Sequence, residues 1–209
     1  TGGGFSGTTR QAGGDYNVVI GKGALSTDTL GNKSIAIGVS ALATQNFTSS
    51  IDTFNTAIGH AAGTGVTTGV KNTFLGGLAG DATTDADENV AIGYDSLGTN
   101  ILGGASVAVG ASALRTQNPA SAVTMYNTAV GHFAGYAVTT GVNNTLIGGL
   151  CGDGLTSGSN NSALGIGALS ASTSASNNTA VGASALKANT SGTANVAVGA
   201  LAGDALTTG

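Results

Sequence analysis

The chain has 209 residues, of which 37 are glycine and only 8% are charged, against roughly 25% charged residues in ordinary soluble domains. Aromatic residues make up 4% of the chain, tryptophan is absent, and the formal net charge is -4. This composition argues against nucleic-acid binding, because it offers neither a basic stripe for phosphates nor an aromatic stacking platform.

No apolar run is long enough to span a bilayer, and no charged-then-apolar secretion signal opens the chain. The chain begins at Thr1 without a methionine, so we expect a segment excised from a longer protein, with residues 1–16 as a partial coil or linker. The single cysteine, Cys151, cannot form an internal disulfide, so it gives no information on the redox compartment.

From residue 17 onward, one short pattern repeats: Asn, a small or branched residue, usually Ala, an aliphatic residue and Gly. Eight of the ten intervals between successive repeat glycines span seventeen residues, and the other two span twenty-one. The repeat glycines are Gly21, Gly38, Gly59, Gly76, Gly93, Gly110, Gly131, Gly148, Gly165, Gly182 and Gly199.

A longer duplication is superimposed on this repeat. The segment HAAGTGVTTGVKNTFLGGLAGD from His60 matches HFAGYAVTTGVNNTLIGGLCGD from His132, seventy-two positions further on. The 17–209 repeat domain is therefore predicted to contain two four-coil copies, 38–109 and 110–181.

The positions within each unit have distinct expected roles. The Asn four residues before the repeat glycine suits a turn with left-handed backbone. The aliphatic residue directly before the glycine, such as Ile92, forms a ladder that we expect to fill the interior, and the residue three after the glycine is always small. A second apolar stripe, four after the glycine, is expected to pack against identical chains; it comprises Leu25, Leu42, Leu97, Leu114, Leu169 and Leu186.

Each unit reads as one turn of an all-β solenoid, because glycine and asparagine at fixed positions oppose a helix and the apolar positions alternate. Seventeen residues suffice for two short strands and two turns. About eleven stacked coils would give a rod on the order of 50 Å long. The thin interior of such a roll would gain from association, and we expect three chains around one axis.

The units NTAIG (55–59), NVAIG (89–93), NTAVGASAL (178–186) and NVAVGALAG (195–203) resemble the head repeats of YadA-like trimeric autotransporter adhesins. They are equally similar to related repeats of phage tail-fibre proteins. The resemblance covers residues 17–203, although the coils are longer than is usual in adhesin heads. It implies a left-handed parallel β-roll, a homotrimer, and binding to a cell-surface glycan or surface protein of a host or prey cell. It also implies an extracellular location, on a virion tail or cell surface.

Two longer coils carry the candidate ligand-binding residues. The extra residues lie within segments 43–54 and 115–126, where otherwise scarce large side chains gather, namely Phe47, Phe54, Met125 and Tyr126. Loops on a rigid scaffold often carry recognition, and aromatic faces could stack on sugar rings. The alternative interpretation is that these side chains seal a bulge or pack against a neighbouring subunit.

His60 and His132 each follow a repeat glycine, and in a trimer each could form a ring of three that holds a metal or an anion. Tyr94 occupies the same position in another coil, so the position also tolerates a residue that is not a ligand. The aspartates five after the glycine are expected to cap turns. No metal and no cofactor is predicted.

Enzymatic and ice-binding interpretations fit poorly. Hexapeptide acyltransferases need an aliphatic residue every six positions, polysaccharide depolymerases use paired carboxylates while Glu88 is the only glutamate, and ice-binding solenoids need Thr-x-Thr arrays. We therefore predict a non-enzymatic trimeric fibre segment, from a phage tail fibre or similar host-recognition protein, that mediates attachment. The alternatives are the head of a bacterial trimeric adhesin and a structural spacer without a ligand.

Overall fold

The computed structural model describes residues 14–209, in which every regular element is a β-strand and no helix occurs. None of these residues forms a helix that could cross a membrane. The strands are β1 (Val18–Ile20), β2 (Gly31–Asn32), β3 (Ile35–Ile37), β4 (Ile51–Asp52), β5 (Thr56–Ile58), β6 (Thr73–Leu75), β7 (Val90–Ile92), β8 (Gly103–Gly104), β9 (Val107–Val109), β10 (Val123–Thr124), β11 (Thr128–Val130), β12 (Thr145–Ile147), β13 (Ser162–Leu164), β14 (Thr179–Val181) and β15 (Val196–Val198).

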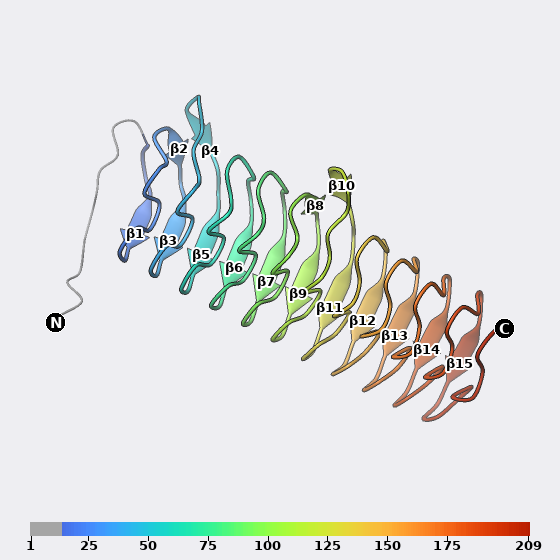
Figure 1. Cartoon of the computed structure of the whole chain (residues 1–209). Helices are drawn as coiled ribbons and strands as arrows, with labels where there is room; N and C mark the ends of the chain where they lie inside the picture. The colour runs from blue at the N-terminus through green and yellow to red at the C-terminus, as the bar shows by residue number, and fades with distance from the viewer. Residues whose placement is uncertain (1–13) are drawn as a thin grey trace.

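Eleven three-residue strands form one parallel sheet in the order β1-β3-β5-β6-β7-β9-β11-β12-β13-β14-β15. Each strand pairs with the equivalent residues of the next coil, as in Thr145↔Ser162 and Ser162↔Thr179. The coils stack into a rod, with β2, β4, β8 and β10 along one edge (Figure 1). The predicted all-β solenoid of about eleven coils, with a spacing of about seventeen residues, is confirmed.

Two short strands were expected in each coil, but most coils contain only the strand of the eleven-stranded sheet. In most coils the side opposite the sheet runs as turns whose amides still bond to the next coil, as Gly63 N donates to Ala79 O (2.9 Å) and Gly65 N to Asp81 O (2.8 Å). Residues two and four after the repeat glycine adopt left-handed backbone, for example Leu114 (φ 48°). The same conformation occurs at these positions in every coil. A short second strand forms further along the coil only at the two insertions, where β2 pairs with β4 and β8 with β10.

The interior is narrow and lined mainly by alanine. The middle residue of each three-residue strand points inward, and the small residue three after the repeat glycine is buried as predicted, Cys151 included. Where Leu146 replaces the usual alanine, Gly135 and Gly152 stand on the neighbouring turns, and a Cβ at either position would lie within 2.9 Å of the Leu146 side chain. Side-chain volume is thus balanced between adjacent coils.

The two apolar stripes lie opposite to their predicted sides. The leucines four after the repeat glycine, expected on the surface, are buried, and Leu42, Leu97 and Leu114 are fully inaccessible. The aliphatic ladder, expected inside, faces outward: Leu75 is 43% exposed and Leu164 is 49% exposed. The reason is the period of two in a strand: because the middle residue points inward, its two neighbours must share the outer side.

The repeated asparagines are also placed differently from the prediction. Except in the first and last coils they are buried, and they do not adopt left-handed backbone; that conformation belongs to the residue before each of them, such as Asn143 (φ 59°). Their Oδ1 atoms accept hydrogen bonds from the backbone amide at the same position of the next coil, as Asn161 N donates to Asn144 Oδ1 (3.0 Å). Their Nδ2 groups donate to carbonyls of the next coil, as Asn144 Nδ2 donates to Gly158 O (2.9 Å). The asparagines therefore form an internal hydrogen-bonded ladder that joins coil to coil.

Serine replaces the ladder asparagine just before each of the two longer coils. A buried glutamine of the longer coil then bridges this serine and the next asparagine by hydrogen bonds. In the second copy, Gln117 Nε2 donates to Ser106 Oγ (3.0 Å), and Asn127 Nδ2 donates to Gln117 Oε1 (2.9 Å). Gln45 joins Ser34 to Asn55 with the same distances in the first copy. The extra residues therefore enlarge the coil without leaving its polar groups unpaired.

We expect Cys151→Leu to destabilise the rod by about 1 to 3 kcal/mol, because a larger side chain must enter a close-packed, narrow interior. Ser112→Ala is the matched control, since Ser112 is only partly buried and loses no packed atoms. Thermal unfolding followed by circular dichroism measures the difference. Identical melting of the two variants would contradict the inward position of Cys151.

Candidate functional site

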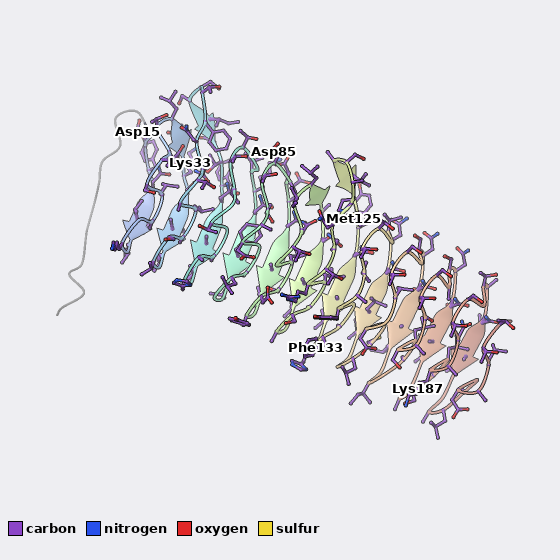
Figure 2. The ribbon with its side chains drawn as sticks, viewed as in Figure 1. Asp15, Lys33, Asp85, Met125, Phe133 and Lys187 are labelled. Carbon is purple, nitrogen blue, oxygen red and sulfur yellow. The ribbon has the colours of Figure 1, made fainter. Side chains whose placement is uncertain are left out.

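The two insertions project from one edge of the rod. In each, a two-residue strand of the longer coil pairs in parallel with the coil before it, β2 with β4 and β8 with β10. Lys33, Asp85 and Met125 mark this insertion edge, whereas Phe133 lies on the opposite edge (Figure 2). The insertions are therefore presented along one side of a rigid scaffold.

The four large side chains predicted to form a binding surface do not gather together. Phe47 is 7% exposed and Met125 is fully buried, so both anchor their insertions from inside. Phe54 (52% exposed) and Tyr126 (64% exposed) reach the surface, but they belong to different insertions, in different copies of the duplication. The structure thus divides the predicted set into two internal anchors and two surface aromatics.

At the first insertion, side chains of the insertion bond to side chains of the preceding coil. Lys33 Nζ donates to Asp52 Oδ2 (2.6 Å) and lies 5.2 Å from the centroid of the Phe54 ring. Asn32 Nδ2 donates to Ser50 Oγ (3.1 Å) in the same place. These four side chains and the Phe54 ring occupy the surface between the insertion and the preceding coil.

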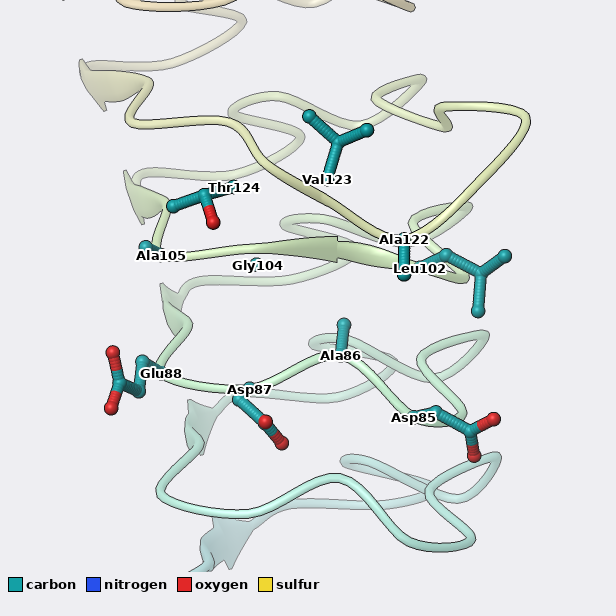
Figure 3. A pocket seen from close by; sticks show the side chains of 10 residues that line it. All are labelled: Asp85, Ala86, Asp87, Glu88, Leu102, Gly104, Ala105, Ala122, Val123 and Thr124. Atoms are coloured by element: carbon teal, nitrogen blue, oxygen red, sulfur yellow. The ribbon is translucent and has the colours of Figure 1, made fainter.

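The second insertion instead leaves a pocket of about 320 Å³. Three successive coils line it, through residues 85–88, residues 102, 104 and 105, and residues 122–124 (Figure 3). The volume lies within the range of small-molecule sites. The pocket combines three carboxylates with small aliphatic side chains and the hydroxyl of Thr124.

The carboxylates of this pocket are held in place by hydrogen bonds. Asp85 Oδ1 accepts from Thr67 Oγ1 (2.6 Å) and Thr68 Oγ1 (2.7 Å), which lowers the pKa of Asp85 below its ordinary value. Asp87 Oδ1 accepts from the amide of Val70 (2.7 Å). These hydrogen bonds join Asp85 and Asp87, in the wall of the pocket, to residues 67–70 of the preceding coil.

The histidines lie on the opposite edge, and both are exposed. The His132 ring packs edge-on against Phe133, at 4.2 Å between centroids, and Phe133 packs against Tyr136 at 4.9 Å. The described residues bring together no group of three or more His, Cys, Asp or Glu side chains that could hold a metal.

An aromatic and charged cluster surrounds His132 that the repeat pattern did not reveal. Arg115 forms an ion pair with Asp95, and its guanidinium lies 5.9 Å from the centroid of the Tyr136 ring. The signal was present in the long duplication, because the equivalent positions in the first copy hold small residues: Gly23, Ala43, Ala61 and Thr64.

The remaining reactive groups are poor candidates for chemistry. Burial raises the pKa of the Cys151 thiol to about 12, so it is not a ready nucleophile. Burial also raises the pKa of Asp81 and Asp153, each of which has one buried carboxylate oxygen without a hydrogen-bond partner among residues 14–209. They stand in equivalent turns of the two copies, not facing each other as a catalytic pair.

The largest uninterrupted surface is the outer face of the eleven-stranded sheet, formed by the first and third residues of each strand. Every one of these positions, two in each of eleven strands, holds Val, Ile, Leu, Thr or Ser. Exposed apolar residues continue around the adjacent turn, for example Val39 (46%), Leu150 (44%) and Ile166 (62%). This outer face carries no charge along the whole described rod.

Comparison of the chain with family models, with curated proteins and with solved structures gives no match.

Proposed function

We propose that this chain is a segment of a non-enzymatic, homotrimeric attachment fibre, of the kind found in phage tail fibres and other host-recognition proteins. The outer face of the sheet is the observation that carries the proposal. The face is uncharged along all eleven strands and carries exposed apolar side chains such as Leu75 and Leu164, and contiguous exposed apolar surface often marks an interaction site. Contact between the outer faces of three chains would remove it from water and add apolar burial that the narrow interior cannot supply.

The attachment role rests on the edges of the rod. A stiff rod with an occluded outer face would still present the insertion edge and the cluster around His132 to solvent. Such positions suit recognition of a glycan or surface protein, because rigid coils hold the side chains in fixed register. The head of a bacterial adhesin would use the same geometry, and a spacer would need only the rod.

The first experiment is the molar mass in solution by light scattering. A homotrimer has three times the chain mass of 19.8 kDa. We expect the trimer for the native chain and dissociation for the double variant Ile92→Asp and Val130→Asp, which places charges on the central outer face. Ser174→Asp, an exposed position outside the sheet, should leave the mass unchanged.

A native chain with the mass of a single protomer at micromolar concentrations would overturn the assembly. If the trimer is found, a glycan array probed with the labelled chain tests attachment. Specific glycan signals that are lost in the pocket variants Ala105→Lys and Glu88→Gln would support recognition. If the chain binds no cell-surface glycan and no cell, the spacer function is favoured.

A further inference from the structure

The pocket at the second insertion is the space that side chains fill at the first. The long duplication lets the two insertions be compared position by position. Four side chains are shortened in the second copy, and the pairs are Asn32 and Gly104, Lys33 and Ala105, Ser50 and Ala122, and Asp52 and Thr124. The first insertion therefore shows which chemical groups this place accommodates.

One of these groups is a hydrogen-bond acceptor. In the first copy the backbone amide of Asp15 donates to Asn32 Oδ1 (2.7 Å). The equivalent amide, that of Asp87, lies 3.8 Å from where a Cβ on Gly104 would be and donates no hydrogen bond within residues 14–209. The pocket therefore contains a backbone donor whose counterpart is paired in the first copy.

The second group is a cation. The registers of β7, β9 and β11 place Glu88, Ala105 and Tyr126 in one column on successive coils. In the equivalent column of the first copy, the ammonium of Lys33 packs against the Phe54 ring. At the second insertion Ala105 leaves that position empty, and Thr124 stands where Asp52 pairs with Lys33 in the first copy. The groups that can attract a cation there are Glu88 of the preceding coil, in the pocket wall, and Tyr126 of the following coil, next to the pocket lining.

The walls of the pocket set the remaining chemistry. Asp85, Asp87 and Glu88 outnumber the one nearby cation, Lys71, which bonds to Glu88 Oε1 (3.0 Å) from the preceding coil. Leu102 and Val123 add apolar surface on two sides of the pocket (Figure 3). The ligand that fits is small and positively charged, with oxygens close to its charge and an apolar C–H face.

We propose that this pocket binds an amino sugar, whose ammonium takes the position of the Lys33 ammonium beside Glu88 and Tyr126. A neighbouring ring oxygen or hydroxyl accepts the amide hydrogen of Asp87, as Asn32 Oδ1 does for Asp15. The apolar face of the sugar packs on Val123. This assignment names the ligand class of the attachment function proposed above and rests on it.

The test is a titration of the full chain with glucosamine and with glucose, followed by saturation-transfer NMR. The two sugars differ in that glucosamine carries an ammonium where glucose carries a hydroxyl. We expect saturable binding of glucosamine and at least about tenfold weaker binding of glucose, equivalent to about 1.4 kcal/mol. Because a soluble sugar is titrated, the result does not depend on the trimer or on any cell.

Two variants locate the binding. Ala105→Lys supplies the ammonium from within, as Lys33 does at the same left-handed backbone position, and should abolish glucosamine binding. Glu88→Gln keeps the shape and removes the charge, and should weaken glucosamine at least about tenfold while leaving the weak glucose signal unchanged. Ala194→Lys, the same column position in the last coil, is the control and should bind as the native chain does.

Equal binding of the two sugars, no binding of glucosamine to the native chain, or native binding by Ala105→Lys would each overturn the amino-sugar site. None of these results would change the molar mass, so failure of the site and failure of the fibre assembly are distinguishable.

Discussion

Replacing Gly148 by alanine is expected to lower the free energy of unfolding of the rod by about 3 kcal/mol or more. Gly148 has φ +134°, a conformation that L-residues rarely adopt, and an added Cβ would lie 2.6 Å from the carbonyl carbon and oxygen of Gly165. All eleven repeat glycines have φ between +126° and +142°. The substitution therefore combines backbone strain with a clash against the next coil.

Gly149→Ala provides a matched control one residue away. A Cβ at Gly149 would have only His132 O within 4 Å, at 3.9 Å. We expect this variant to melt within about 0.5 kcal/mol of the native chain. Urea unfolding followed by circular dichroism compares the two variants, and equal midpoints would show that the positive φ does not require glycine at the repeat position.

The second large effect is expected from Asn144→Ala, which removes one rung of the asparagine ladder. The change leaves the amide of Asn161 and the carbonyl of Gly158 without the partners that Asn144 supplies. An unpaired buried polar group costs about 1 to 3 kcal/mol, so the loss should reach about 2 to 6 kcal/mol. Neighbouring coils should open together, because each coil is stabilised by its neighbours.

Asn118→Ala is the control for the ladder, since Asn118 is exposed in the second insertion and only its backbone amide bonds to the next coil. Amide hydrogen exchange measured on both variants locates the damage. We expect faster exchange around Asn161 in Asn144→Ala and no change there in Asn118→Ala. Unchanged protection in both would mean that the ladder does not stabilise the stack.

The two copies of the duplication have diverged on their surfaces while keeping their interiors. Gln45 and Gln117 make the same buried connections in the two longer coils. On the surface, Lys33 pairs with Asp52 and packs against Phe54 at the first insertion. The second copy has a pocket at this place and an additional aromatic cluster around Phe133. A conserved interior with variable edges supports the recognition role proposed above, because loops on a rigid scaffold often carry recognition.

Sequence periodicity was sufficient to predict the coils. Glycine and asparagine at two fixed intervals specified an all-β solenoid, the number of coils and the places of both insertions. The invariably small residue three after the repeat glycine marked the interior, because a large side chain there would have no room. The candidate pocket was not predicted: Tyr126, next to its lining, was identified, but not the carboxylates of residues 85–88 two coils earlier.

The tertiary structure decided which side of each strand faces inward. In a sequence such as Asn-Val-Ala-Ile-Gly, Val and Ile share one face and Ala the other, and all three are apolar, so the alternation does not say which face is buried. In the closed coil the middle residue of the strand faces the interior, which the leucines four after the repeat glycine already fill, and so this position is usually alanine while Val and Ile point outward. The same closure brings the asparagines into register and places Gly104 and Ala105 next to Asp87 and Glu88 of the preceding coil. No single repeat contains these contacts between coils.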